Sequence, residues 1–218
     1  MPVLPVKGQG TFPVRRIYCV GRNYAAHAAE MGDEVDREVP FYFTKSAHAL
    51  LQSGQDMPYA PRTTDLHHEI ELVVAIGTQT ENVAKEEAID AVFGLACGLD
   101  MTRRDLQAAA KEQGRPWDTA KDFDNAAIIG PITPIADAGI WGGLPIQLRV
   151  NDMVVQDARL SDMVWSVREI IADLSTLYTL QAGDLIMMGT PAGVGSVNPG
   201  DQLVGSIGAL DPVMTKIV

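Results

Sequence analysis

Alternating apolar and polar positions predict several short strands along the chain. In Glu69–Gly77 the apolar residues Ile70, Leu72, Val74 and Ile76 recur at every second position, so they share one face of a strand. Shorter or fully apolar stretches predict further strands in the same way. These are Arg16–Val20, Phe41–Lys45, Phe93–Leu99, Leu185–Met188 and stretches of the tail from Gly200 onward.

Three helices are expected between these strands. Asn23 is placed to cap the first, over Tyr24–Met31, which Gly32 ends. A hydroxyl residue followed three positions later by an acidic residue has capping-box spacing, and it opens the other two helices at Thr102-Arg103-Arg104-Asp105 and Ser166-Val167-Arg168-Glu169. The last helix should bury one apolar face, formed by Ile170, Ile171, Leu174 and Leu177.

The connections between the elements predict the fold class. Asn151-Asp152 separates the strand-like stretches Ile146–Val150 and Val154–Asp157, which is typical of a hairpin. Strands are many and helices few, and the two do not alternate as βαβ units. The pattern therefore predicts an α+β, β-rich fold rather than a doubly wound sheet. We expect a loose, Pro/Gly-rich lead-in at residues 1–14 and a single catalytic domain at residues 15–218.

Composition and charge exclude some classes of partner. The 218 residues are 46% hydrophobic and 21% charged, with a net charge of −11. Such an acidic protein repels nucleic acid and anionic lipid, and no apolar run approaches the ~20 residues of a membrane span. Cys19 and Cys97 lie in apolar stretches, as buried thiols do in a reducing compartment. We expect a cytoplasmic protein without nucleic-acid or membrane partners.

Glu69 and Glu71 carry the first chemical signal. On a strand they point to one face, and the next residues on that face, Val73 and Ala75, are apolar. Because like charges at this spacing repel each other, a cation is one natural partner; two solvated glutamates at a strand end are the other interpretation. Oxygen ligands favour Mg²⁺ or Mn²⁺, and Leu72 stands where a zinc-protease motif needs its second histidine.

Asp100 is a third candidate metal ligand. Asp100 ends the apolar stretch Phe93–Leu99, where a carboxylate is costly unless it is paired or binds a metal; a helix-capping or turn role is the alternative.

His27 and Glu30 are spaced i, i+3 on a predicted helix and can touch there. A glutamate in that position orients the imidazole ring as a general base, whereas an exposed helix that carries both residues is the alternative.

Two loops complete the candidate chemistry. The glycine-rich segment Gly189–Gly195 lacks the lysine and hydroxyl residue of a phosphate loop, but its backbone donors can hold a carboxylate. Lys121 lies in a predicted loop beside Trp117 and Phe123. These aromatic neighbours suit the wall of a pocket, and a solvated surface lysine is the alternative.

Taken together and in this order, the segments resemble the fumarylacetoacetate hydrolase family from Ile17 to about Asp211. Each segment alone is a weak signal, whereas the ordered set is specific to the family. The resemblance is carried by Tyr18-Cys19-Val20-Gly21-Arg22-Asn23-Tyr24 with His27 and Glu30, His68-Glu69-Ile70-Glu71-Leu72, Asp100-Met101-Thr102-Arg103-Arg104-Asp105, Lys121, and Gly189-Thr190-Pro191-Ala192-Gly193-Val194-Gly195.

The resemblance implies a mixed β-sandwich or roll of the family's type with a few short helices, assembled as a homodimer. It implies Mg²⁺ or Mn²⁺ held by Glu69, Glu71 and Asp100. It also implies that His27 and Glu30 form a water-activating dyad on a lid, residues 27–39, whose charged part at 33–39 we expect to be mobile.

Further residues match family positions that act on substrate. Lys121 matches a catalytic position, and the substrate-binding positions are Arg22, Lys45, Arg104, Gln107 and Thr190. For Lys45 the match is weaker, because Ser46 replaces a proline common in this branch.

The chain length and the segment Gly114-Arg115-Pro116-Trp117 resemble the acylpyruvate hydrolase branch of the family. Within that branch, the resemblance implies hydrolysis of fumarylpyruvate, a reaction of bacterial gentisate breakdown. This implies a small anionic 2-oxo acid as substrate, attacked by water that His27 deprotonates, with Lys121 facing the developing negative charge. The same fold also supports oxaloacetate decarboxylation, or isomerisation with decarboxylation of related 2-oxo acids. A 2-oxo acid-binding protein without catalysis would not need the dyad of His27 and Glu30.

Overall fold

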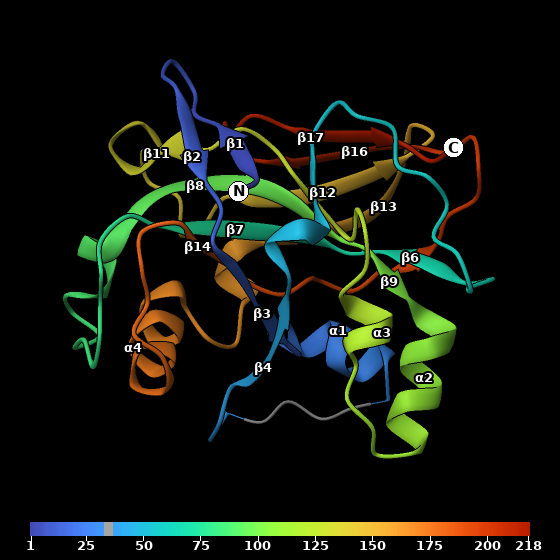
Figure 1. The fold of residues 1–218 in the computed structure, drawn as a ribbon, viewed down its shortest axis with the longest axis horizontal. Coiled ribbons are helices and arrows are strands. Elements are labelled where there is room, and N and C mark those ends of the chain that lie inside the picture. Colours follow the sequence, from blue (N-terminus) through green and yellow to red (C-terminus); the bar gives the residue numbers. More distant parts are fainter. Residues whose placement is uncertain (33–36) are drawn as a thin grey trace.

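A computed structural model describes residues 1–32 and 37–218. Its centre is a curled, mixed eight-stranded sheet (Figure 1). Most neighbouring strands in this sheet are antiparallel. Within the described residues, only β3 with β14 and β5 with β10 form parallel pairs. Across the sheet the order is β4 (Phe41–Lys45), β3 (Arg16–Gly21), β14 (Asp184–Met187), β7 (Ile70–Ile76), β8 (Val92–Asp100), β10 (Ala127–Ile129) and β5 (Leu50–Gln52), with β11 (Thr133–Pro134) also paired to β8.

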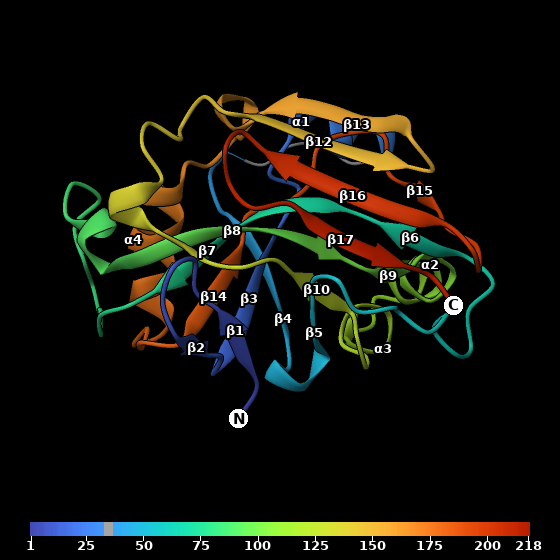
Figure 2. The same ribbon diagram turned by 90° about the horizontal axis from the view of Figure 1, so that it is seen from above.

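A second, four-stranded antiparallel sheet lies across β7 and β8 (Figure 2). Its order is β13 (Met153–Arg159), β12 (Pro145–Val150), β16 (Gln202–Ile207) and β17 (Val213–Lys216). The predicted hairpin at Asn151-Asp152 is confirmed, and both residues adopt the left-handed backbone of a tight turn, with φ of 49° and 66°. The main core fills the space between the two sheets, where Ile70 and Leu72 pack with Leu148 and Leu203.

A small sheet continues the two strands that carry the candidate ligands. It contains β15 (Gly195–Ser196), β6 (Leu66–His68) and β9 (Thr102–Arg103). Glu69 joins β6 to β7, and Met101 joins β8 to β9, so the main sheet passes into the small one at these two residues.

The N-terminal segment corrects one prediction. Residues 1–14 are not loose, because β1 (Val3–Pro5) and β2 (Thr11–Pro13) form an antiparallel hairpin. Leu4, Phe12 and Val14 are buried in a second core with residues from the opposite face of the main sheet, such as Val73. Burial of these side chains holds the hairpin in place, and the boundary between lead-in and catalytic domain stays a prediction.

Helices cover the two ends of the main sheet. α2 (Arg104–Glu112) and the short α3 (Asp118–Lys121) lie at the end near β9, and α4 (Val167–Leu177) lies at the opposite end (Figure 1). α1 (Ala25–Glu30) follows β3, and short 3₁₀ turns occur at Ala47–Ala49, Ala88–Ala91, Ile135–Asp137 and Leu160–Asp162. None of the helices in the described part of the chain has the length and apolar character needed to cross a membrane.

The capping predictions had mixed outcomes. Ser166 and Glu169 form the expected capping box of α4. Asn23 does not cap α1: its side chain bonds instead to the backbone of Trp165 and Met188, and the N-cap position is Tyr24.

The second predicted capping box is wrong. Thr102 belongs to β9, and Arg103 occupies the N-cap position of α2 without a side-chain cap. Asp105 accepts hydrogen bonds from Thr63 and Thr64 instead. The inner face of α4 also ends early, because Leu177 is 60% exposed.

Candidate active site

Strand register brings the three candidate metal ligands together. β7 and β8 are antiparallel neighbours with Glu71 opposite Gly98, and the backbone N–H of Asp100 donates to the carbonyl of Glu69 at 2.8 Å. All three side chains of Glu69, Glu71 and Asp100 are buried, and each offers an oxygen within 4.8 Å of the others. Three buried carboxylate oxygens this close are the donor set that a hard divalent cation prefers.

Lys121 is the principal cation of this cluster. Its Nζ donates to Glu69 Oε2 at 2.7 Å, to Asp100 Oδ2 at 2.9 Å and to Thr102 Oγ1 at 2.7 Å. It lies at the end of α3 rather than in a loop as predicted, and Trp117 and Phe43 are beside it on the pocket wall. The short helix therefore aims the ammonium at two of the three carboxylates.

Arg104 holds the other oxygen of Glu69. Its guanidinium donates to Glu69 Oε1 and to the side-chain oxygen of Gln107, one turn further along α2. Its Nε donates to Nδ1 of His67 at 3.2 Å, and the Nε2 of His67 lies 2.9 Å from Asp65. Burial and the charge of Arg104 lower the pKa of His67, which favours the neutral ring that this arrangement needs.

The pKa values show how the charges balance. Burial raises the pKa of Glu69, but Lys121 and Arg104 outweigh that effect and bring it below its usual range. Burial lowers the pKa of Lys121, and Asp100 with Glu69 more than compensates. Glu71 behaves differently: burial, followed by the charges of Asp100 and Glu69, raises its pKa well above the ordinary value. One further positive charge at Glu71 would relieve this, and a divalent cation fits that need.

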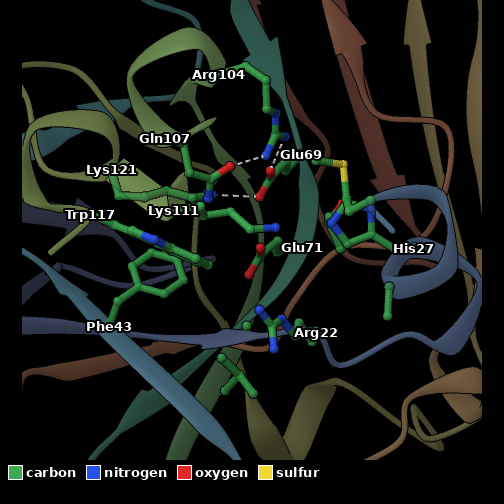
Figure 3. Close-up of a pocket in the computed structure, with 15 residues that line it drawn as sticks. Arg22, His27, Phe43, Glu69, Glu71, Arg104, Gln107, Lys111, Trp117 and Lys121 are labelled. Carbon is green, nitrogen blue, oxygen red and sulfur yellow. Dashed lines mark hydrogen bonds and ion pairs between the residues drawn. The ribbon is translucent and has the colours of Figure 1, made fainter. Parts of the chain in front are cut away.

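A pocket opens over the cluster (Figure 3). Glu69, Glu71 and Lys121 lie on its wall with four of the five predicted substrate-binding residues. Lys45 is the exception: it is fully buried, outside the pocket wall, with its Nζ 2.7 Å from Asp100 Oδ1. The other residues that line the pocket are Val20, Gly21, Arg22, His27, Ala28, Met31, Phe43, Arg104, Gln107, Lys111, Trp117 and Thr190.

Lys111 is a pocket residue that the sequence analysis missed. Arg104, Gln107 and Lys111 are spaced i, i+3 and i+7 on α2, so they share one face of the helix. Figure 3 shows the Lys111 ammonium pointing into the pocket above Glu71. The same spacing could have identified Lys111 in the sequence, once Arg104 and Gln107 were assigned to the pocket.

His27 and Glu30 meet as their spacing predicts. His27 Nδ1 lies 3.3 Å from Glu30 Oε2, and the His27 ring faces the pocket. Glu30 also accepts the backbone N–H of Gly193 at 3.1 Å. Since an ionised carboxylate only accepts, this contact places the proton on Nδ1 and leaves Nε2 able to take a proton.

The glycine-rich segment holds carboxylates of the protein itself. The N–H of Gly189 donates to Glu71 Oε2 at 2.8 Å, and the N–H of Gly193 binds Glu30. The backbone N–H groups of this segment therefore do bind carboxylates, and these belong to a candidate metal ligand and to the partner of His27. Thr190, between these two positions, lines the pocket.

Comparison with known proteins agrees with this geometry. The family model described as fumarylacetoacetate (FAA) hydrolase C-terminal matches residues 16–218. A fumarylpyruvate hydrolase of Ralstonia sp is 48% identical over 179 residues, covering 81% of this chain and 93% of that protein. A mitochondrial oxaloacetate tautomerase of Arabidopsis thaliana, FAHD1, is 39% identical over 209 residues, covering 96% and 92%.

A solved structure is similar over the whole chain. It is a fumarylpyruvate hydrolase from Pseudomonas aeruginosa in complex with Mn²⁺ and pyruvate, with a TM-score of 0.96 and 44% sequence identity. The similarity covers 100% of this chain and 95% of that one. The β-rich fold with a few short helices, expected from the sequence, is confirmed by this likeness.

Proposed function

This chain belongs to the fumarylacetoacetate hydrolase family, and from that premise we propose that it is a metal-dependent hydrolase of acylpyruvates. The proposed reaction converts fumarylpyruvate and water to fumarate and pyruvate. The observation that carries it is that His27, whose ring contacts Glu30, lines the same pocket as the carboxylates Glu69 and Glu71. A general base beside a metal-binding triad suits hydrolysis, because one activates water and the other holds the 2-oxo acid.

Glu69, Glu71 and Asp100 are the proposed ligands of Mg²⁺ or Mn²⁺. Their oxygens lie within 4.8 Å of one another, and the raised pKa of Glu71 indicates a deficit of positive charge there. Mn²⁺ accompanies pyruvate in the similar Pseudomonas aeruginosa enzyme. When bound, such a cation polarises the 2-oxo acid and stabilises negative charge on its pyruvate half.

The side chains of the chain supply the remaining steps. His27 Nε2 takes a proton from water while Glu30, 3.3 Å from Nδ1, keeps the ring in orientation. The resulting hydroxide adds to the distal carbonyl carbon, the bond between that carbon and C3 of the pyruvate half breaks, and C3 receives a proton. Lys121 and Arg104 present positive charge along this wall of the pocket to the developing anion.

The proposed substrate carries a second carboxylate at its far end. The pocket carries four cationic side chains, Arg22, Arg104, Lys111 and Lys121, which is more than one metal-bound 2-oxo acid requires. Arg22 and Lys111 are the two that we propose as partners of the distal carboxylate. Arginine can hold a carboxylate in a bidentate pair, and lysine acts as a point charge. The proposal includes a homodimer and a place in cytoplasmic gentisate breakdown, both of which the family resemblance implies.

A comparison of three substrates under one metal condition tests the function. With Mn²⁺ supplied, we expect kcat/KM to be highest for fumarylpyruvate, lower for acetylpyruvate, and lower again for the disappearance of oxaloacetate. The similarity to the oxaloacetate tautomerase from Arabidopsis thaliana favours a second candidate function, tautomerisation of oxaloacetate. His27 lines the pocket and could move a proton at C3 of oxaloacetate. Faster tautomerisation or decarboxylation of oxaloacetate than hydrolysis of either acylpyruvate would replace the proposed function with that one.

A further inference from the structure

Gln156, on β13, has a buried side-chain amide whose hydrogen bonds all go to the protein. The side chain is 1% exposed. Its Oε1 accepts the backbone N–H of Ile70 at 3.0 Å and lies 3.2 Å from His68 Nδ1. Its Nε2 donates to Thr190 Oγ1 at 2.9 Å and to the carbonyl of Pro191 at 2.8 Å. Two acceptor and two donor positions are thereby used, which is the full capacity of an amide.

The partners of Gln156 belong to two different parts of the site. Ile70 lies between the candidate ligands Glu69 and Glu71, so the Oε1 contact fixes the backbone from which both carboxylates project. Thr190 lines the pocket, and Pro191 is the next residue of the glycine-rich segment. Gln156 itself does not line the pocket among the described residues, which excludes direct contact with a substrate there.

The glycine-rich segment also rests on the backbone of β13. Gly193 has φ of +94°, and a Cβ at this position would lie 2.1 Å from the carbonyl oxygen of Val155. Only glycine permits that approach. The segment is therefore packed against Val155 and Gln156 while its N–H groups hold Glu71 and Glu30.

We propose that Gln156 is a positioning residue that couples the metal-binding strand to the substrate-contacting segment. Its carbonyl oxygen sets the backbone of the ligand strand, and its NH₂ group sets Thr190 and Pro191 above it. The inference rests on the proposed function only in taking Glu69 and Glu71 as metal ligands. Removing the amide should loosen both parts, because buried polar groups on both sides lose their partners.

Two variants separate the two halves of this coupling. Gln156→Met keeps the length of the side chain and removes all four hydrogen bonds. Gln156→Glu keeps acceptors for Ile70 and His68 but offers the carbonyl of Pro191 no donor. The matched control is Gln147→Met on β12, where the neighbours Ile146 and Leu148 are buried and Gln147 points to the other face of the same sheet.

Two readouts need no substrate: Mn²⁺ affinity by calorimetry, and amide hydrogen exchange at residues 189–195 in metal-free protein. For Gln156→Met we expect Mn²⁺ affinity to fall about 10–100-fold, the range typical of residues that orient metal ligands, and exchange at 189–195 to accelerate. For Gln156→Glu we expect faster exchange at 189–195 with no loss of Mn²⁺ affinity. The Gln147→Met control should match the wild type in both readouts.

Two results would overturn the coupling. One is a Gln156→Met protein that matches Gln147→Met in both readouts, since Gln156 would then only fill space. The other is a Gln156→Glu protein with unchanged exchange at residues 189–195, which decides the matter even if Gln156→Met does not fold. Failure of the proposed metal site is distinguished separately, because wild-type protein and Glu71→Ala would then bind Mn²⁺ equally.

Discussion

Lys45 lies against Asp100 inside the protein, with its Nζ 2.7 Å from Asp100 Oδ1 and neither side chain exposed. Backbone carbonyls of Met101 and Lys121 also accept from the Lys45 ammonium. The contact adds a third cation to the buried cluster. Lys45, Arg104 and Lys121 form ion pairs with Asp100 and Glu69, whereas Glu71 accepts the backbone N–H of Gly189. Lys45 thus has a place behind a candidate metal ligand rather than on the pocket wall.

The first prediction follows from that contact. Lys45→Met leaves Asp100 with one cation fewer in a buried site, and breaking a buried pair typically costs about 3–5 kcal/mol. We expect the free energy of unfolding of the metal-free protein to fall by an amount of that order, measured by urea denaturation. Added Mn²⁺ should recover part of the loss, because it supplies positive charge to the same carboxylates.

Lys85→Met is the matched control for this variant. Lys85 pairs with Glu169 at 2.9 Å on the surface, and exposed pairs contribute about 0–1 kcal/mol. If Lys45→Met instead keeps the stability of the wild type and raises KM for the acylpyruvate, then Lys45 acts on substrate, as the sequence resemblance implied.

The second prediction concerns pH and the metal. The pKa of Glu71 is raised by burial and by Asp100 and Glu69, so metal-free protein binds a proton there that the unfolded chain has already lost above its ordinary pKa. The contribution of Glu71 to stability therefore falls as pH rises from about 4.5 toward the raised value. Metal binding displaces this proton, so affinity should increase with pH over the same range.

Thermal unfolding with and without Mn²⁺ measures this effect. We expect the Mn²⁺-induced rise in Tm to be larger at pH 8 than at pH 5.5, and calorimetry in buffers of different ionisation enthalpy should detect proton release on binding. In Glu71→Gln, which cannot release a proton, the pH dependence should weaken. A wild-type Mn²⁺ affinity that is flat between these pH values would show that Glu71 is already ionised in the metal-free protein.

Periodicity made the ligand strands predictable. Ile70, Leu72, Val74 and Ile76 marked β7 by their spacing, and the apolar run that ends at Asp100 marked β8. The strands are buried on both faces, so any polar side chain at their ends had to be paired or bound. What the sequence could not show was the register, which the fold sets by pairing β7 with β8.

Long-range contacts explain the predictions that were wrong. Asn23 has the right type for an N-cap, but its side-chain oxygen accepts the backbone N–H of Trp165, 142 positions away in the chain, instead of an N–H of α1. The carboxylate of Asp105 is likewise taken by Thr63 and Thr64. Local spacing gives the side chain's capacity for hydrogen bonding, whereas tertiary packing selects the partner. Gln156 was missed for the same reason, since nothing adjacent in the sequence indicates its partners.

The third prediction treats His27 and Glu30 as one unit. Loss of a general base typically lowers the rate about 10²–10⁴-fold, and residues that act together are not additive. We expect His27→Ala and Glu30→Ala each to reduce kcat severely, and the double variant to be little worse than His27→Ala. Initial rates with fumarylpyruvate at saturating Mn²⁺ measure this.

Glu30→Gln is the control for the hydrogen bond between Glu30 and the backbone of Gly193. Glu30 also accepts the N–H of Gly193, so part of its effect could come from the glycine-rich segment. A glutamine side-chain oxygen still accepts that N–H but lacks the negative charge that favours a protonated ring. Two mild and multiplicative losses in the single variants would show that the pair is an ordinary contact of α1 rather than a catalytic unit.

The last prediction assigns the distal carboxylate of the substrate. Lys111 and Arg22 both line the pocket, and their charged ends point into it (Figure 3). A hydrogen bond to a charged group is worth about 1.5–3 kcal/mol, which corresponds to a factor of roughly 10–150 in kcat/KM. For Lys111→Gln we therefore expect a loss of about that size with fumarylpyruvate. With acetylpyruvate, which has no distal carboxylate, we expect a change of less than about threefold, since the lost hydrogen bond is absent there. Arg22→Gln measured in parallel identifies which of the two cations makes the contact, because only the partner of the carboxylate should separate the two substrates. Equal losses for both substrates in Lys111→Gln would place Lys111 at the shared pyruvate end. If wild-type protein hydrolyses the two substrates equally well, the distal carboxylate has no partner in this pocket, although the acylpyruvate hydrolase function itself would stand.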